Sequence, residues 1–377
     1  MTAGRQWIFL LLFLPLTVHS QWRGGIEAGT LFDDNVFNNS LQIADRVSEL
    51  SLQGAYEWTT GGHDLQLFYS GILDYFALLP ARTFQLHTAG LAYTREPEED
   101  TGTLWNAGVD LSLRDNREDY TIYDYIQFSL YANLHAELGE QFRLKGGYSL
   151  RSVAFSELQE FDYLEHVFFV QAATSLPSAT TFIAQADLGF KSYATPNADT
   201  TIATSSTGRR AGRSNVSAAP AVSQLITTLR IGQGITGSTG LSLTGQYQVS
   251  LAKESRYLLV EGGILTDDEI FDDHYGFDGP SLSLTATQIL PGDMQFRVSG
   301  SVQERRYSSR PAFDLSGMEL APQRIDTRQV VSLSLEKSFD ALGLRAALSY
   351  DIIRNLSNDT QYTYRNHAVA LSVSFLH

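Results

Sequence analysis

The chain has 377 residues, a formal net charge of -15 and no cysteine. The absence of cysteine excludes disulfide frameworks, thiolate metal sites and cysteine nucleophiles, and the acidic balance makes the chain a poor nucleic-acid binder. Mean hydropathy is -0.13, which excludes a bundle of membrane helices, while the length allows one large barrel or two ordinary domains.

The chain opens with a segment typical of a secretory signal peptide. Arg5 precedes an apolar run over residues 7–18, and Ser20 supplies a small residue before a plausible cleavage point at Gln21. This run is too short for a stable membrane helix, and no second apolar stretch reaches the ~20 residues that such a helix needs. We therefore expect a signal peptide over residues 1–20 and an exported mature chain over residues 21–377.

Residues 125–138, YIQFSLYANLHAEL, alternate strictly between apolar and polar side chains. Successive side chains of a strand leave the backbone on opposite faces, so this segment predicts a strand with one apolar and one polar face. Strands of soluble domains are usually about five to six residues long, whereas strands that cross a membrane need roughly ten. The pattern favours a strand with its leucines toward lipid and its polar side chains toward a wet or plugged interior.

The same alternation recurs along the chain and predicts sixteen strands. We expect them to begin near residues 22, 45, 63, 83, 102, 122, 142, 163, 180, 219, 239, 278, 294, 326, 343 and 363. Connections after even-numbered strands are short and rich in Gly, Pro, Asp and Ser, as tight turns require. All the long connections, at about 194–218, 253–277 and 308–325, follow odd-numbered strands.

This segregation of loop lengths is typical of outer-membrane barrels, whose periplasmic turns are short and whose extracellular loops are long. A soluble β-sandwich has no reason to segregate its loops in this way. The sequence therefore predicts an all-β fold, a single transmembrane antiparallel up-and-down β-barrel of about sixteen strands, with 14–18 as the range. The even count places both termini on the periplasmic side.

The last residues, HAVALSVSFLH, support this interpretation. Apolar side chains alternate up to Phe375, which stands third from the end. The segment resembles the closing strand that the barrel insertion machinery recognises, although that strand usually ends on its aromatic residue. We expect the insertion machinery, outer-membrane lipid and lipopolysaccharide as partners; the alternative is the closing strand of a secreted β protein.

Charged residues on the polar faces of these strands are candidate lumen-lining groups. The acidic ones are Glu27, Glu49, Asp74, Asp110, Glu137, Asp187, Glu336 and Asp351. The basic ones are Arg114, Arg143, Lys145, Arg151, Lys191, Arg297, Arg305 and Arg345. The structural interpretation is that they pair across neighbouring strands of the wall. The functional one is that opposed charges set a transverse field that filters ions and solutes.

The segment LTDDEIFDDHYGFDG, residues 265–279, concentrates carboxylates in one expected loop. Oxygen-rich clusters suit Ca²⁺ or Mg²⁺, which gives a candidate divalent-cation site, although the spacing departs from the twelve-residue calcium loop. The candidate ligands are Asp267, Asp268, Glu269, Asp272 and Asp273. The alternatives are a solvated acidic loop and a loop that folds inward to narrow the pore. Apart from such a loop-bound cation, we expect no cofactor.

Two further features bear on function. Residues 194–220 are rich in Ser, Thr, Ala and Gly and carry three arginines, which predicts a flexible exposed loop, with contact to an acidic polysaccharide or lipopolysaccharide phosphate as the alternative. His274 stands beside Asp272 and Asp273, and such a pair on a loop could activate water. No hydrolase motif accompanies it, so we expect the protein not to be an enzyme.

Residues 31–39, LFDDNVFNN, follow directly on the first expected strand. This stretch resembles the first strand and loop of outer-membrane barrels associated with exopolysaccharide export, a resemblance that implies a role in passing or anchoring polysaccharide. The alternative is that Asp33, Asp34 and Asn35 simply form the first extracellular turn. The similarity to porins is architectural.

Three hypotheses follow. The first is a porin-like channel for small solutes or saccharides, and the second is a non-conducting barrel that anchors an assembly or secretion partner. The third is a surface hydrolase that uses His274. A conducting lumen separates the first from the second.

Overall fold

The computed structural model describes the chain from residue 20 to residue 376, with short gaps. The described residues are 20–95, 102–194, 213–216, 219–252, 256, 258–260, 263–265, 273–314, 316 and 318–376. The expected signal peptide, apart from Ser20, therefore lies outside the described residues, as does most of the arginine-bearing loop.

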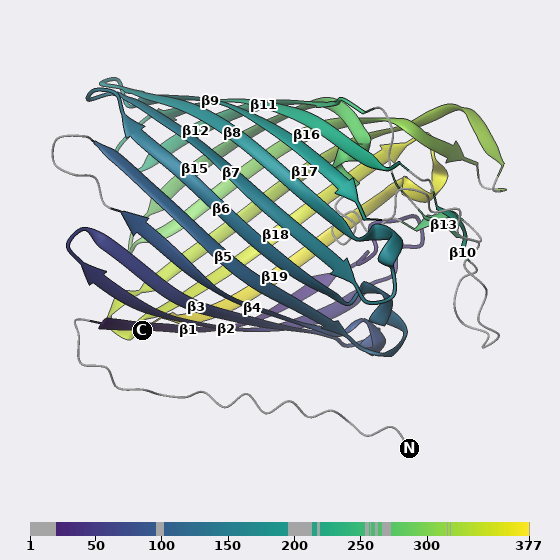
Figure 1. Cartoon of the computed structure of the whole chain (residues 1–377), viewed down its shortest axis with the longest axis horizontal. Helices are drawn as coiled ribbons and strands as arrows, with labels where there is room; N and C mark the ends of the chain where they lie inside the picture. The colour runs from purple at the N-terminus through teal and green to yellow at the C-terminus, as the bar shows by residue number, and fades with distance from the viewer. Residues whose placement is uncertain are drawn as a thin grey trace, which may run out of the picture.

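Sixteen antiparallel strands close into one barrel, in which each strand pairs with its neighbour in the chain order and β1 pairs with β19 (Figure 1). The predicted fold class and strand number are confirmed. The barrel strands are β1 (Ser20–Asp33), β2 (Asp45–Thr60), β3 (His63–Phe76), β4 (Phe84–Arg95), β5 (Thr103–Asn116), β6 (Tyr125–Glu137), β7 (Phe142–Phe155), β8 (Tyr163–Leu176), β9 (Thr180–Tyr193), β11 (Ala221–Gly234), β12 (Thr239–Ser250), β15 (Phe277–Leu290), β16 (Met294–Phe313), β17 (Glu319–Phe339), β18 (Leu344–Ser357) and β19 (Tyr364–Leu376).

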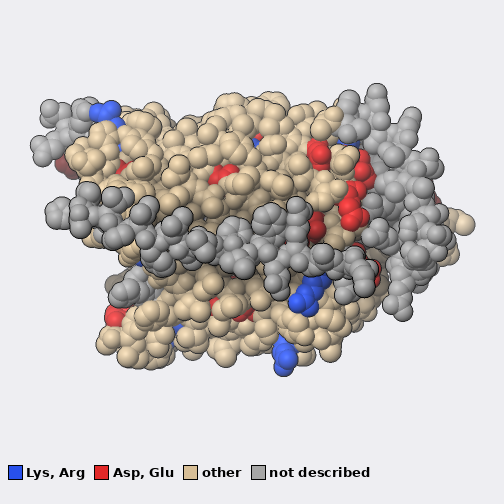
Figure 2. All heavy atoms as spheres, turned by 60° about the horizontal axis from the view of Figure 1, so that its bottom comes forward, with Lys and Arg blue, Asp and Glu red and all other residues tan. Residues whose placement is uncertain are grey.

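The outer surface carries a belt of exposed apolar side chains. On β6, for example, Ile126, Phe128, Leu130 and Leu134 are each 39–52% exposed, while the residues between them point inward. Figure 2 shows that charged side chains are sparse over the described middle of this surface and that carboxylates gather toward one end. A continuous apolar belt on a closed barrel fits a lipid environment, because closure satisfies every backbone group that lipid cannot.

The two ends of the barrel differ. At the end that we call the turn end, tight connections place glycines at positive φ, including Gly61 (φ 55°), Gly62 (φ 79°) and Gly292 (φ 76°). Glycine adopts this backbone region without the steric cost that a Cβ brings. Among the described residues, the opposite end, the loop end, carries five 3-10 helices, whereas η5 (Asp340–Leu342) is at the turn end. The loop-end helices are η1 (Pro80–Arg82), η2 (Glu118–Tyr123), η3 (Gln159–Phe161), η4 (Asp273–Gly276) and η6 (Thr360–Tyr362).

All three long connections expected to be loops contain strand residues. Residues 308–325 extend the hairpin of β16 and β17, so that β17 begins at Glu319 and not near residue 326. The pairing is irregular around Pro311, because proline has no N–H to donate to the ladder. A separate three-stranded sheet joins β10 (Arg213–Val216), β13 (Leu258–Val260) and β14 (Gly263–Leu265), short strands that the sequence pattern did not predict.

Among the described residues, no helix is both long enough and apolar enough to span a membrane.

Candidate functional site

All sixteen charged residues singled out from the sequence occupy strand positions that alternate with the exposed apolar side chains. Glu27, for example, follows the exposed Ile26 on β1. Asp187 stands three residues before the exposed Phe190 on β9, so the two side chains point to opposite faces. Because successive strand side chains point to opposite faces, these residues lie on the inner wall. Their role in lining a solute path is a prediction that conductance measurements test.

One sector of the inner wall is acidic. Glu49 on β2 lies directly opposite Asp74 on β3. On the other side, Glu49 lies opposite Gly29 of β1, so Glu27, two residues before Gly29, is its diagonal neighbour. Like charges directly opposite each other in a sheet destabilise it, so this sector attracts cations. No basic residue shares this part of β2 or β3.

Near the loop end, an ion pair joins two neighbouring strands of the inner wall. Arg151 on β7 and Glu165 on β8 are paired in register, with a guanidinium–carboxylate distance of 2.6 Å. The Glu165 side chain is only 5% exposed. Arg151 was among the candidates, whereas Glu165 was missed, because Val167 and Phe169 follow it at inward positions and hide the alternation.

Lys191 on β9 continues this charged row and is 1% exposed. It lies opposite Glu165 in the register, and its ammonium group is 3.9 Å from the ring centroid of Tyr163 and 5.4 Å from that of Tyr193. Ammonium groups are attracted to aromatic faces at such distances. The buried lysine therefore has both a carboxylate neighbour and a cation–π environment.

The segment after the acidic loop folds onto the inner wall at this same place. Tyr275 of η4 is 2% exposed and donates a hydrogen bond of 2.5 Å from its hydroxyl to the Glu165 carboxylate. Its ring lies against Gly189 of β9, where a Cβ would be 2.5 Å from the tyrosine Oη. Burial and the neighbouring Glu165 carboxylate raise the pKa of Tyr275, which keeps the hydroxyl protonated and donating.

The backbone of η4 is held as well. The Gln248 side-chain amide donates hydrogen bonds to the carbonyls of His274 and Phe277, the latter at 3.0 Å. Of the alternatives for the acidic loop, the described part therefore packs inward at residues 273–277. The signal for this packing in the sequence is the pair of aromatic residues Tyr275 and Phe277 within the acidic segment.

The proposed cation site cannot be placed. Asp267, Asp268, Glu269 and Asp272 lie outside the described residues, and only the backbone of Asp273 is described. Within the described part of the chain, no group of three or more His, Cys, Asp or Glu side chains is arranged to hold a metal ion. The rings of His274 and Tyr275 contact each other at a tilt of 37°, with centroids 4.6 Å apart.

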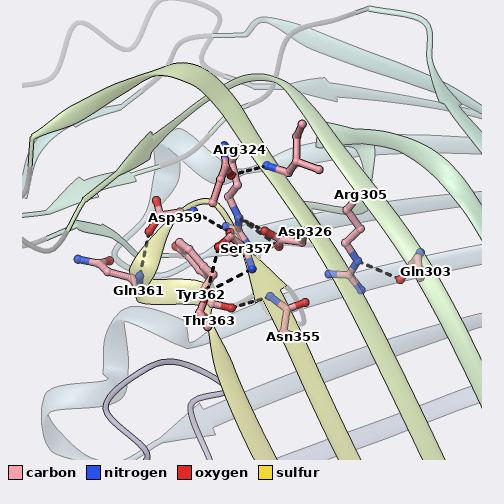
Figure 3. Close-up of polar contacts among 12 residues, drawn as sticks. Gln303, Arg305, Arg324, Asp326, Asn355, Ser357, Asp359, Gln361, Tyr362 and Thr363 are labelled. Carbon is pink, nitrogen blue, oxygen red and sulfur yellow. Dashed lines mark hydrogen bonds and ion pairs between the residues drawn. The ribbon is translucent and has the colours of Figure 1, made fainter.

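A second buried ion pair supports the extended hairpin. Arg324 and Asp326 on β17 are 3% and 1% exposed, with a shortest distance of 2.5 Å between charged atoms (Figure 3). The guanidinium carbon is 3.3 Å from the ring centroid of Tyr362 and 4.5 Å from that of Tyr307. Of this cluster, only Arg324 falls in the expected loop over residues 308–325. The cluster joins the hairpin to η6.

The stretch that resembles polysaccharide-export barrels closes the barrel seam. Asn35 is fully buried, and its side-chain amide donates to the carbonyls of Asn39 at 2.7 Å and Arg365 at 3.3 Å. The Asp34 carboxylate accepts from the backbone N–H of His367 at 2.7 Å. These contacts tie the first loop to β19, as the alternative of a first structural turn predicts.

Comparison with solved structures finds the same architecture. The chain is similar to OpdQ of Pseudomonas aeruginosa (TM-score 0.54, 11% identity) over 96% of this chain and 99% of that one. It is also similar to OccAB1 of Acinetobacter baumannii (TM-score 0.54, 10% identity, 95% of this chain and 96% of that one). A third similar structure is OccK8 (OprE) of Pseudomonas aeruginosa (TM-score 0.52, 12% identity, 95% and 98%).

No protein-family model and no curated protein sequence matches the chain. At this level of identity the shared property is the fold, which is the porin-like sixteen-stranded β-barrel. The comparisons do not extend to the polysaccharide-export role that the resemblance implied.

Proposed function

We propose that the protein is an outer-membrane channel through which small polar solutes diffuse. The observation that carries this proposal is the combination of an exposed apolar belt with an inner wall of charged and polar side chains on one closed barrel. Sixteen strands usually enclose a lumen wide enough for water and small solutes. The similarity in fold to the Occ and Opd outer-membrane proteins supports this reading.

The orientation follows from the same features. We place the loop end outside the cell and the turn end in the periplasm, since outer-membrane barrels carry their long loops outside. Both described chain ends, in β1 and β19, lie at the turn end (Figure 1). Residues 1–20 then act as the signal peptide, and N-terminal sequencing of the protein recovered from outer membranes should begin at Gln21.

The inner-wall charges act together in this proposal. The acidic sector around Glu49 and Asp74 attracts cations. The ion pair of Arg151 and Glu165 sets the electrostatic potential near the outer mouth. Tyr275 narrows the mouth from the side of β8 and β9. Small solutes are therefore expected to pass and larger ones to be excluded.

A liposome-swelling assay tests the channel proposal. Vesicles that contain the refolded mature barrel should swell in isosmotic solutions of small sugars or amino acids, at rates that fall as solute size increases. Vesicles without protein provide the baseline. A correctly folded barrel that gives no swelling with any small solute would overturn the proposal.

A further inference from the structure

Three aromatic side chains of the inner wall lie flat over glycines of a neighbouring strand. Phe68 lies directly opposite Gly90, Tyr131 opposite Gly108, and Phe169 opposite Gly147. A Cβ built on Gly90 would be 2.6 Å from Cζ of Phe68, and one on Gly108 would be 2.6 Å from Cζ of Tyr131. On Gly147 it would be 2.9 Å from Cζ of Phe169.

These contacts define how the rings are oriented. Since the far end of each ring occupies the space that a Cβ on the adjacent strand would need, the ring lies along the wall instead of projecting toward the barrel axis. All three side chains are half-buried, and because they stand at inward strand positions their exposed part faces the lumen. The glycines are what permits this, because any larger residue would occupy the space of the ring.

The three rings lie at a similar depth. Phe68 is eight residues from the loop end of β3, while Tyr131 and Phe169 are each six residues from the loop ends of β6 and β8. They cover parts of β4 and β5, which are neighbours, and of β7, which β6 separates from β5. Tyr275 lies over Gly189 in the same manner, closer to the loop end. The rings therefore form a discontinuous aromatic track that leads inward from the mouth.

Amide and carboxylate groups accompany the track. Asn133 donates a hydrogen bond of 2.9 Å to Asn106 beside Tyr131, and Gln171 donates one of 2.6 Å to Gln185 beside Phe169. Gln185 in turn donates to Asp187, which lies directly opposite Phe169. Asp110 lies opposite Gly90, next to the ring of Phe68.

The wall across the barrel is rich in hydroxyl groups. Strands β15, β16 and β17 stand about eight places around the barrel from β4, β5 and β6. Their inward positions include Ser283, Thr285, Ser299, Ser301, Ser332 and Ser334. The wall opposite the aromatic track therefore offers uncharged hydrogen-bonding groups to the lumen.

We propose that this track binds neutral saccharides as they pass through the lumen, with the flat C–H faces of sugar rings on the three aromatic rings and the sugar hydroxyls on the flanking amides and carboxylates. The inference rests on the proposed channel function and names its solute class. Asp110 and Asp187 beside the rings repel anionic aromatic solutes, while they can accept hydrogen bonds from sugar hydroxyls. Weak binding at several points suits a channel, since each solute must also leave.

Block of single-channel current by a neutral linear hexasaccharide, maltohexaose, tests the proposal. We expect concentration-dependent interruptions of the current through the unmodified barrel, and little block by benzoate at the same concentration. Phe169→Ala should weaken the block about fivefold to tenfold, as expected for the loss of one aromatic contact. Phe169→Tyr should retain it, because the ring is kept.

Phe168→Ala is the matched control, since Phe168 is the adjacent residue on β8 and is 49% exposed on the outer surface. It removes the same side chain from the lipid face and should leave the block unchanged. An open channel that maltohexaose does not block, or one in which Phe169→Ala and Phe168→Ala behave alike, overturns the saccharide track and leaves the channel function standing. A barrel without current overturns both.

Discussion

Asn35 shows how one short side chain can secure the seam of a barrel. Its amide holds the first loop to β19 through the carbonyl of Arg365, and Asn366 donates back to the Asn35 carbonyl at 3.1 Å. Asn35→Ala leaves the carbonyls of Asn39 and Arg365 without the amide donor and should lower the free energy of unfolding by about 1–3 kcal/mol. Equilibrium urea unfolding of the barrel in lipid vesicles measures this change.

The control is Asn39→Ala, because the Asn39 side chain only caps the exposed N–H of Leu41. Equal losses of stability in the two variants would contradict a special role for Asn35 in closing the seam.

Asp326 offers a second prediction about single residues. Asp326→Asn leaves the guanidinium of Arg324 buried between two tyrosine rings without its carboxylate, and removing one partner of a buried ion pair costs about 3–5 kcal/mol. Glu336→Gln is the control, since its pair with Arg345 is partly exposed and such pairs contribute about 0–1 kcal/mol. The same urea unfolding assay compares the two variants. Similar losses in the free energy of unfolding would show that burial does not determine how much each ion pair contributes.

Among the structural elements, η4 bears most directly on the pore. The hydroxyl of Tyr275 anchors it to a buried carboxylate, and a hydrogen bond to a charged group contributes about 1.5–3 kcal/mol. Tyr275→Phe should therefore raise the equilibrium constant between the released and the anchored segment by about tenfold or more. The change should be seen as additional current steps in single-channel records.

Tyr148→Phe is the matched control for this change, because the Tyr148 hydroxyl bonds to His166 at 2.8 Å on the outward face. If both variants show the same current steps, or if neither differs from the unmodified barrel, the hydrogen bond of Tyr275 does not control how far η4 narrows the pore.

The elements also show what the sequence could and could not predict. Strands that cross the apolar belt were predicted closely, and those beginning at Asp45, His63 and Phe142 begin at the predicted residues. There the lipid forces alternation on the sequence. Beyond the belt this constraint ends, so the hairpin around Pro311 was mistaken for a loop.

The residues of the candidate site were likewise predictable only as far as the alternation of apolar and polar side chains extends. Alternation identified inward positions such as Glu49 and Lys191, but not which residues meet across strands or from loops. The contact between Glu165 and Tyr275 joins residues 110 positions apart in the chain. Likewise, the aromatic track depends on which glycine faces which ring, and this follows from the register and not from composition.

For the molecule as a whole, the acidic sector predicts the ion preference of the lumen. Replacing both Glu49 and Asp74 by their amides should move the selectivity toward anions, since it removes two facing carboxylates and leaves the charge of the neighbouring Arg114 on the wall. Reversal potentials under a KCl gradient measure the change. Glu304→Gln, on the outward face of β16, should leave the potential unchanged, and an equal shift would argue against a role for the inner wall.

The central claim is that this barrel encloses an open path, and single-channel recording in a planar bilayer tests it most directly. The purified mature protein should insert and give steady, discrete current steps. A barrel that is folded by circular dichroism and by heat-modifiable gel mobility, yet inserts without passing current, would contradict the claim.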